Sequence, residues 1–116
     1  MTQPFEDLAG LDRLIHEPTR LAILTALSAC AVADFLYLQS LTGVTKGNLS
    51  NHLAKLEDGG LIALEKTYDR KTPRTRVHLT ASGVEAIARH WQRLEELHEA
   101  ARAWTPAVAP RINPQS

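Results

Sequence analysis

Apolar side chains recur every three or four positions over the first part of the chain, which is the spacing of one helix face. The first such run predicts an amphipathic helix over residues 5–16, with an inner face of Leu8, Leu11 and Ile15. Pro18 suits the first position of a second helix, because a helix start makes no use of the missing N–H. The inner face of that second helix is expected to consist of Leu21, Leu24, Leu27 and Ala31.

A third, short helix is predicted over residues 35–41. Asp34 is a good N-cap for it, because a carboxylate can accept hydrogen bonds from the free N–H groups of a first turn. The preceding residues 30–33 are small and are expected to be a simple connection. Thr42-Gly43-Val44 breaks the helix and leaves a tight turn before the next one.

The fourth helix carries the clearest pattern. Thr45 can cap it, and Gly59-Gly60 can end it in the left-handed conformation that glycine tolerates. Its inner positions are spaced four and three residues apart: Leu49, Leu53 and Leu56. Two helices joined by a tight turn place the second across the first, so the fourth helix can enter a DNA major groove, which is wide enough for one helix.

Alternating positions then replace the helical spacing, and this change predicts two strands. The first strand is marked by Ile62, Leu64 and Tyr68, and the second by Thr75, Val77 and Leu79. Residues 69–74 are expected to be the loop between them, so that the pair forms an antiparallel hairpin with a basic tip.

A long last helix is predicted after the cap Thr80, with a coiled-coil-like seam. The seam positions alternate by three and four: Val84, Ile87, Trp91, Leu94, His98 and Ala101. A monomer would leave this apolar stripe partly exposed, which soluble monomers rarely tolerate. We therefore expect a homodimer whose dimerisation residues are Leu8, Leu11, Ile15, Val84, Ile87, Trp91, Leu94 and His98.

Composition sets only broad limits. With 116 residues, of which 44% are apolar, the chain can bury one modest core. The single cysteine, Cys30, excludes an intramolecular disulfide and a cysteine-rich zinc site, and it fits a reducing, cytoplasmic location. No apolar run approaches the roughly 18 residues of a membrane span, and residues 1–10 lack the basic start of a signal peptide, so no membrane partner is expected.

The distribution of charge changes this picture more than its total. The formal net charge is zero, which by itself argues against nucleic acid. Residues 45–76 nevertheless hold seven basic and four acidic side chains, a local net charge of +3. Positive charge therefore gathers in the stretch of chain that holds the fourth helix and the hairpin.

Three motifs in this order resemble the winged-helix regulators of bacteria and archaea, especially the arsenic-repressor and multiple-antibiotic-resistance-regulator groups. The motifs are EPTRLAIL at residues 17–24, KGNLSNHLAKLEDGGLI at 46–62 and PRTRVHLTASG at 73–83. The resemblance covers roughly residues 18–89 and implies a dimeric repressor or activator. The expected fold is thus an α+β winged helix-turn-helix over residues 1–105, with a two-stranded wing and flanking dimerisation helices, followed by a flexible proline-containing tail over residues 106–116.

A helical wheel identifies the side of the fourth helix that would face double-stranded DNA. If the three leucines point inward, the outward and flanking positions are small or polar. Asn51 could pair with adenine and Lys46 with guanine, whereas Gly47 would permit a close approach. The candidate DNA-binding residues of this helix are Thr45, Lys46, Gly47, Asn48, Ser50, Asn51 and Lys55. The alternative is a merely solvated helix face.

The hairpin tip supplies a second candidate contact. Four basic residues surround Pro73 and suit phosphates or a narrow minor groove: Arg70, Lys71, Arg74 and Arg76. Arg70 and Arg74 are the strongest candidates. The same charges could instead form a solubilising surface.

Other functional classes receive less support. No phosphate-binding glycine loop, nucleophile elbow or carboxylate pair indicates an enzyme, and no cofactor is expected. Only Glu95 and His98 stand at ligand spacing on one helix face, so a metal site would need a second copy. A small-molecule effector could occupy a cavity lined by Leu11, Phe35, Tyr37 and Trp91, although such residues usually pack in a core.

The main rival is a winged-helix protein-interaction module with little DNA affinity, whose working surface is the last helix. It predicts no dependence of duplex binding on salt, whereas DNA binding predicts a steep one.

Overall fold

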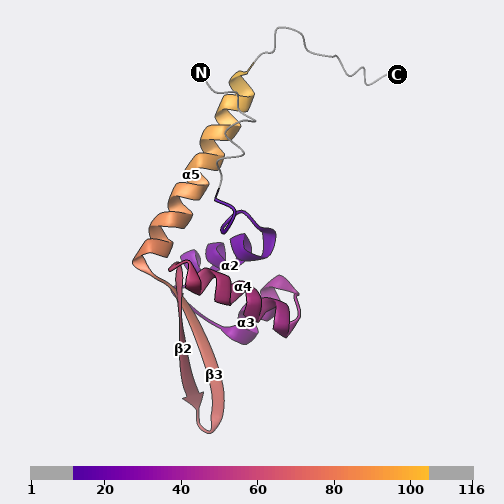
Figure 1. Cartoon of the computed structure of the whole chain (residues 1–116), viewed down its shortest axis with the longest axis vertical. Helices are drawn as coiled ribbons and strands as arrows, with labels where there is room; N and C mark the ends of the chain where they lie inside the picture. Colours follow the sequence, from indigo (N-terminus) through magenta and orange to yellow (C-terminus); the bar gives the residue numbers. More distant parts are fainter. Residues whose placement is uncertain (1–11, 105–116) are drawn as a thin grey trace, which may run out of the picture.

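The computed structural model describes residues 12–104, which form the predicted α+β fold (Figure 1). Within this range the elements are α2 (Pro18–Ala29), β1 (Val32–Asp34), α3 (Phe35–Thr42), α4 (Lys46–Asp58), β2 (Ile62–Asp69), β3 (Thr72–Leu79) and α5 (Ala81–Ala103). Helices α2, α3 and α4 gather beside the base of the β2–β3 hairpin, and α5 runs away from it in the opposite direction (Figure 1). None of the helices in the described part of the chain is long and apolar enough to cross a membrane.

Local polar groups fix the helix ends, as the sequence predicts. Asp34, Thr45 and Thr80 each accept a hydrogen bond from a backbone N–H in the first turn of α3, α4 and α5, at 2.9, 3.2 and 3.0 Å. These bonds satisfy N–H groups that have no partner within the helix. Gly43 ends α3 with a φ of 71°, in the left-handed region where a side chain would be strained.

The sheet has three antiparallel strands in the order β1-β3-β2. The prediction that residues 30–33 are a simple connection is therefore wrong in part, because Val32 pairs with His78 and Ala33 with Val77. A strand of three residues is too short to show an alternating pattern. It exists because β3 offers it a partner far along the chain.

The hairpin is tighter than the sequence suggests. Its strands run on to Asp69 and resume at Thr72, so only Arg70 and Lys71 form the turn, and the predicted loop over residues 69–74 is wrong. Two-residue turns match the right-handed twist of the strands that they join. Arg70 has a φ of 60° and Lys71 has no positive φ, and a positive φ at the first turn residue alone is the pattern of a type II′ turn.

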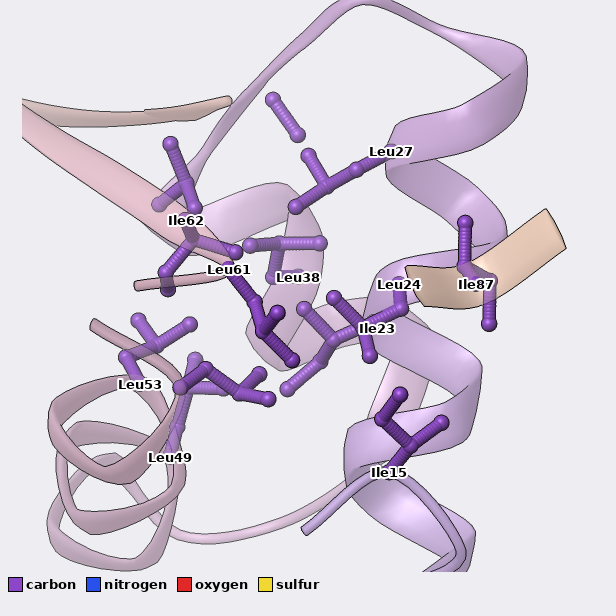
Figure 2. Close-up of a cluster of buried hydrophobic side chains, with 13 residues drawn as sticks. Ile15, Ile23, Leu24, Leu27, Leu38, Leu49, Leu53, Leu61, Ile62 and Ile87 are labelled. Carbon is purple, nitrogen blue, oxygen red and sulfur yellow. The ribbon is translucent and has the colours of Figure 1, made fainter. Parts of the chain in front are cut away.

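The start of the described chain also differs from expectation. Residues 13–15 form a turn, in which Asp12 accepts hydrogen bonds from the backbone N–H groups of Leu14 and His16. The prediction of a helix reaching His16 is therefore wrong. Ile15 is 1% exposed and lies in the core of its own chain (Figure 2), which corrects its assignment to a dimer interface. Leu8 and Leu11 lie outside the described residues.

The core joins every element except the hairpin tip (Figure 2). The predicted inner face of α4 is confirmed, because Leu49, Leu53 and Leu56 are all fully buried. In α2 the buried residues are Ile23, Leu24 and Leu27. Ala31 is exposed and follows the end of α2, so its predicted inward position is wrong.

Helix α5 joins the core only through its first turns. A Cβ on Gly83 would overlap the carbonyl of Leu61, so the helix start is packed directly against backbone. Ile87 is also buried in the core, whereas Val84 and Trp91 are 54% and 41% exposed. Part of the predicted seam is therefore buried in the core and part remains exposed. Ile87 is corrected from a dimerisation residue to a core residue of its own chain.

Candidate nucleic-acid interface

The outer side of α4 is fully presented to solvent. The buried leucines seat the helix on the core, and the remaining helical positions project from it. Every α4 residue proposed from the sequence for DNA contact is exposed: Thr45, Lys46, Gly47, Asn48, Ser50, Asn51 and Lys55. Because no bulky apolar side chain stands among them, this face can lie close to a polyanion without burying an unfavourable group.

The hairpin carries its charges in two different settings. Arg70 and Lys71 form the exposed turn at the far end of the hairpin, and Arg76 is exposed on β3. Arg74 is less free, because its side chain is 33% exposed and its Nη1 lies 3.8 Å from Oδ2 of Asp34. The structure thus separates a free basic tip from a guanidinium that already has an acidic neighbour.

A groove of about 370 Å³ connects the two parts of the surface. Lys46 and Ser50 of α4 line one side of it, and residues 72–75 of β3 line the other. Phe35 and Leu36 complete the lining together with Asp34. The structure therefore brings Lys46, Ser50 and Arg74 to one groove, whereas Arg70 and Lys71 stand at the hairpin end and Lys55 in the last turn of α4.

Asp34 is the residue of this surface that sequence reasoning missed. The sequence predicts Asp34 as the cap of α3, and that role is confirmed. Its second role depends on β1, which places it opposite Arg76 in the sheet and within ion-pair distance of Arg74. A local capping pattern contains no signal for that long-range contact.

The aromatic residues expected around an effector cavity are only partly brought together. Tyr37 and Trp91 share an open surface groove of about 590 Å³ with Leu21 and Leu41. Trp91 also borders a second apolar groove of about 680 Å³ between α2, β3 and α5. Phe35 lines the groove beside α4 instead, and Leu11 lies outside the described residues.

Two histidines that lie far apart in the sequence are close together in the structure. His16 Nδ1 lies 3.3 Å from His90 Nε2, and His90 is only 3% exposed. Burial lowers the pKa of His90, the nearby charges of His16 and Arg93 lower it further, and Asp12 opposes the shift. Within the described residues no group of three or more His, Cys, Asp or Glu side chains is arranged to hold a metal ion.

The fold and its two-part basic surface define the class of winged-helix DNA-binding proteins. The chain matches the family model described as winged helix DNA-binding domain over residues 19–98, and it belongs to this family. The winged-helix resemblance recognised in the three sequence motifs is thereby confirmed.

Two relatives are similar over much of the chain. An uncharacterized protein of Methanocaldococcus jannaschii is 30% identical over 71 residues, which are 61% of this chain and 77% of that protein. The structure of a transcriptional regulator homologue from Pyrococcus horikoshii OT3 is also 30% identical, with a TM-score of 0.77 over 83% of this chain and 97% of that chain.

Two further structures share the fold at lower identity. Wild-type MarR from E. coli, in its apo form, is 23% identical with a TM-score of 0.66, covering 89% of this chain and 75% of its own. The transcriptional repressor CouR, bound to a 23-mer DNA duplex, is 19% identical with a TM-score of 0.68, covering 86% and 68%. These structures support the likeness to MarR-type regulators at the level of the fold.

Proposed function

We propose that this winged-helix regulator binds duplex DNA as a homodimer, with α4 in the major groove and the hairpin turn on the backbone or in the minor groove. The observation that carries the proposal is the shared groove, which is lined by Lys46 and Ser50 on one side and by Arg74 of the hairpin on the other. Helix and hairpin thus offer basic groups to one continuous surface. The duplex in the CouR structure supports this use of the fold.

Each exposed residue of α4 has a role in this proposal. Lys46, in the first turn of the helix, donates to guanine, and Asn51 pairs with adenine through its amide. Ser50 and Lys55 contact phosphates, which fix the position of the helix without reading sequence. Gly47 lets the helix backbone approach the bases, because it has no side chain to hold the two surfaces apart.

The hairpin adds affinity more than specificity. Arg70 and Lys71 reach phosphates or a narrow minor groove from the exposed turn. Arg74 contributes less, because its guanidinium already interacts with Asp34. The net charge of +3 over residues 45–76 supports binding to a polyanion despite the neutral total.

Pairing of two copies is assigned to the exposed side of α5. Val84 and Trp91 remain on that side once Ile15 and Ile87 are counted in the core, and Leu94 is half-buried beside them. Sedimentation equilibrium tests this pairing. The wild-type chain is expected at twice its monomer mass, Trp91→Ser at the monomer mass, and Tyr68→Ser on the hairpin at the wild-type value.

DNA binding is tested by fluorescence anisotropy with a labelled mixed-sequence duplex at several salt concentrations. The double substitution Arg70→Ala and Lys71→Ala is expected to weaken binding and to lower the slope of log affinity against log salt by about 3.6, since the dimer loses two phosphate contacts in each copy and each contributes about 0.9. The matched control is Arg89→Ala with Arg102→Ala on α5, which removes the same charge far from the hairpin turn.

The outcomes separate the two functions. Steep salt dependence that is reduced only by the hairpin substitutions supports the regulator. Absent or salt-insensitive binding favours the protein-interaction module. Equal effects of the two double substitutions would mean that net charge, rather than this surface, governs affinity.

A further inference from the structure

The carboxylate of Glu17 lies between the start of α2 and the middle of α4. It caps α2 by accepting a hydrogen bond from the backbone N–H of Arg20 at 2.9 Å. The same oxygen, Oε2, lies 4.0 Å from Nε of Arg20 and 3.6 Å from Nδ1 of His52. His52 belongs to α4, so this contact crosses between two helices.

Two buried side-chain nitrogens, one of Arg20 and one of His52, lie near the carboxylate of Glu17. Among the described residues, Arg20 Nε and His52 Nδ1 are the buried side-chain nitrogens or oxygens that have no hydrogen-bond partner. A buried polar atom without a partner is costly and calls for an explanation. Both atoms lie within ion-pair distance of the Glu17 carboxylate, which gives each of them a compensating charge.

The Glu17 carboxylate is held in its charged form. Burial opposes ionisation, but hydrogen bonds from the backbone N–H groups of Arg20 and Thr19, with the nearby charges of His52 and Arg20, lower the pKa of Glu17 below 4.5. The carboxylate is therefore negative throughout the neutral range.

Apart from the contact with Glu17, the side of α4 that packs on the core is apolar. Leu49, Leu53 and Leu56 hold the helix on the core, but hydrophobic burial is non-directional, so it tolerates small rotations of the helix about its axis that keep these leucines buried. A polar contact has a preferred direction and distance. Among the described residues, the contact from Glu17 to His52 is the polar link between the α2 segment and α4.

The position of His52 links its contact with Glu17 to the residues of α4 that are proposed to contact DNA. Asn48 stands one turn before His52 and Lys55 one turn after it, so the three lie along the same flank of α4. A rotation of α4 that moves His52 away from Glu17 therefore moves Asn48 and Lys55 with it.

We propose that Glu17 and His52 are positioning residues, which fix the rotation of α4 about its axis and thereby aim its outer face at the base edges. The proposal rests on the DNA-binding function proposed above. It assigns to Glu17 a part in sequence recognition although that residue lies outside α4 and the hairpin.

The first test uses the free protein and needs no DNA. Glu17→Gln keeps an oxygen to cap α2 and removes only the charge, and His52→Gln removes the other partner. Both are expected to shift the ¹H–¹⁵N amide signals of α4 around Asn48 and Lys55, and the double variant to shift them no further. Glu96→Gln, an exposed acid on α5, is the control and should leave these signals unchanged.

The second test compares a duplex selected for tight binding with a mixed-sequence duplex. Glu17→Gln is expected to weaken binding to the selected duplex by about fivefold, the effect of roughly one lost hydrogen bond between uncharged groups. Binding to the mixed duplex should weaken less, because the phosphate contacts of the hairpin turn do not depend on the rotation of α4. A merely structural role would weaken binding to both duplexes alike.

The two tests distinguish failure of the inference from failure of the function. Unchanged α4 signals in Glu17→Gln, whose substituted residue lies outside α4, or an unchanged ratio between the two duplexes, would overturn the positioning role. If the wild-type chain binds no duplex, the DNA-binding function fails and its recognition role falls with it, while the amide signals still decide whether Glu17 orients α4.

Discussion

Replacing Gly47 by alanine should strengthen the fold and weaken DNA binding. Gly47 is the second residue of α4, is exposed, and has no heavy atom within 4 Å of the position that a Cβ would take. An alanine there meets no obstacle in the free protein. Because glycine within a helix is less favourable than alanine by about 0.5–1 kcal/mol, the free energy of unfolding should rise by up to that amount.

The same methyl group should cost affinity. The wheel places Gly47 on the outward side of α4, where the helix backbone would approach the bases. A methyl group that keeps the helix away would stretch at least one base contact beyond hydrogen-bond length, and a good bidentate contact is worth about 1–3 kcal/mol. The expected loss is therefore about tenfold or more in Kd.

Urea unfolding and duplex anisotropy on the same preparation measure both quantities. Higher stability together with lower affinity is the expected pair of results. If Gly47→Ala gained stability and bound DNA as well as the wild type, α4 would not approach DNA through this face, and the outer-face assignment would be refuted.

Gly83→Ala is the matched control, because the same chemical change should have the opposite effect on stability. Its Cβ would overlap the carbonyl of Leu61, which is backbone and cannot rotate away. Overpacking of this kind costs about 1–3 kcal/mol, which exceeds the helix-propensity gain of at most about 1 kcal/mol. A more stable Gly83→Ala variant would contradict the described packing of the start of α5.

Arg70→Gly should raise the free energy of unfolding by about 1 kcal/mol, because glycine adopts the φ of 60° without strain; a fall in urea unfolding experiments would contradict the described turn. The pKa of His90 is lowered from 6.5 by burial and by the charge of His16, so stability should be complete above pH 6.5 and be lost as the pH falls from there toward the lowered pKa. Urea unfolding at about pH 7.5 and about pH 5.5 measures this loss, which His90→Gln should reduce; equal wild-type stability at both would argue against a buried neutral imidazole. Leu53→Ala should cost about 2–5 kcal/mol in thermal unfolding, and a cost near zero would mean that α4 does not rest on the core.

Features set by neighbouring residues could be predicted from the sequence. The caps Asp34, Thr45 and Thr80 act on N–H groups two or three residues away, and the leucines of α4 follow the helical period directly. The outer face of α4 follows from the same period. These are local rules, and the structure obeys them.

Features set by distant partners could not be predicted. Strand β1 exists because β3 pairs with it, and Ile15 is buried in the shared core although it lies in a turn and not in a helix. The sequence shows the seam of α5 as one stripe, yet the core covers Ile87 and leaves Trp91 41% exposed beside two surface grooves. Periodicity identifies an apolar face but does not identify what covers it.

The candidate site shows the same limit. The contact between His16 and His90 spans 74 positions, and the contacts of Glu17 with His52 and of Asp34 with Arg74 also join separate elements. Each residue has an ordinary local explanation, such as a cap or a surface charge. Only the fold reveals that the pairs meet.

A single residue, Thr80, joins β3 to α5, so the hairpin and the long helix change direction together about this point. Thr80 is fixed there, since its N–H donates to the carbonyl of Leu61 at 3.0 Å and its hydroxyl to the carbonyl of Gly60 at 2.6 Å. Eight strand residues extend the hairpin by about 26 Å from this point. A rotation of about 10° would move the tip by about 4.5 Å, more than the spacing of about 3.4 Å between successive charges on a DNA strand. In a pair of such chains, the angle between the two long helices and the reach of the two basic tips therefore cannot be set independently.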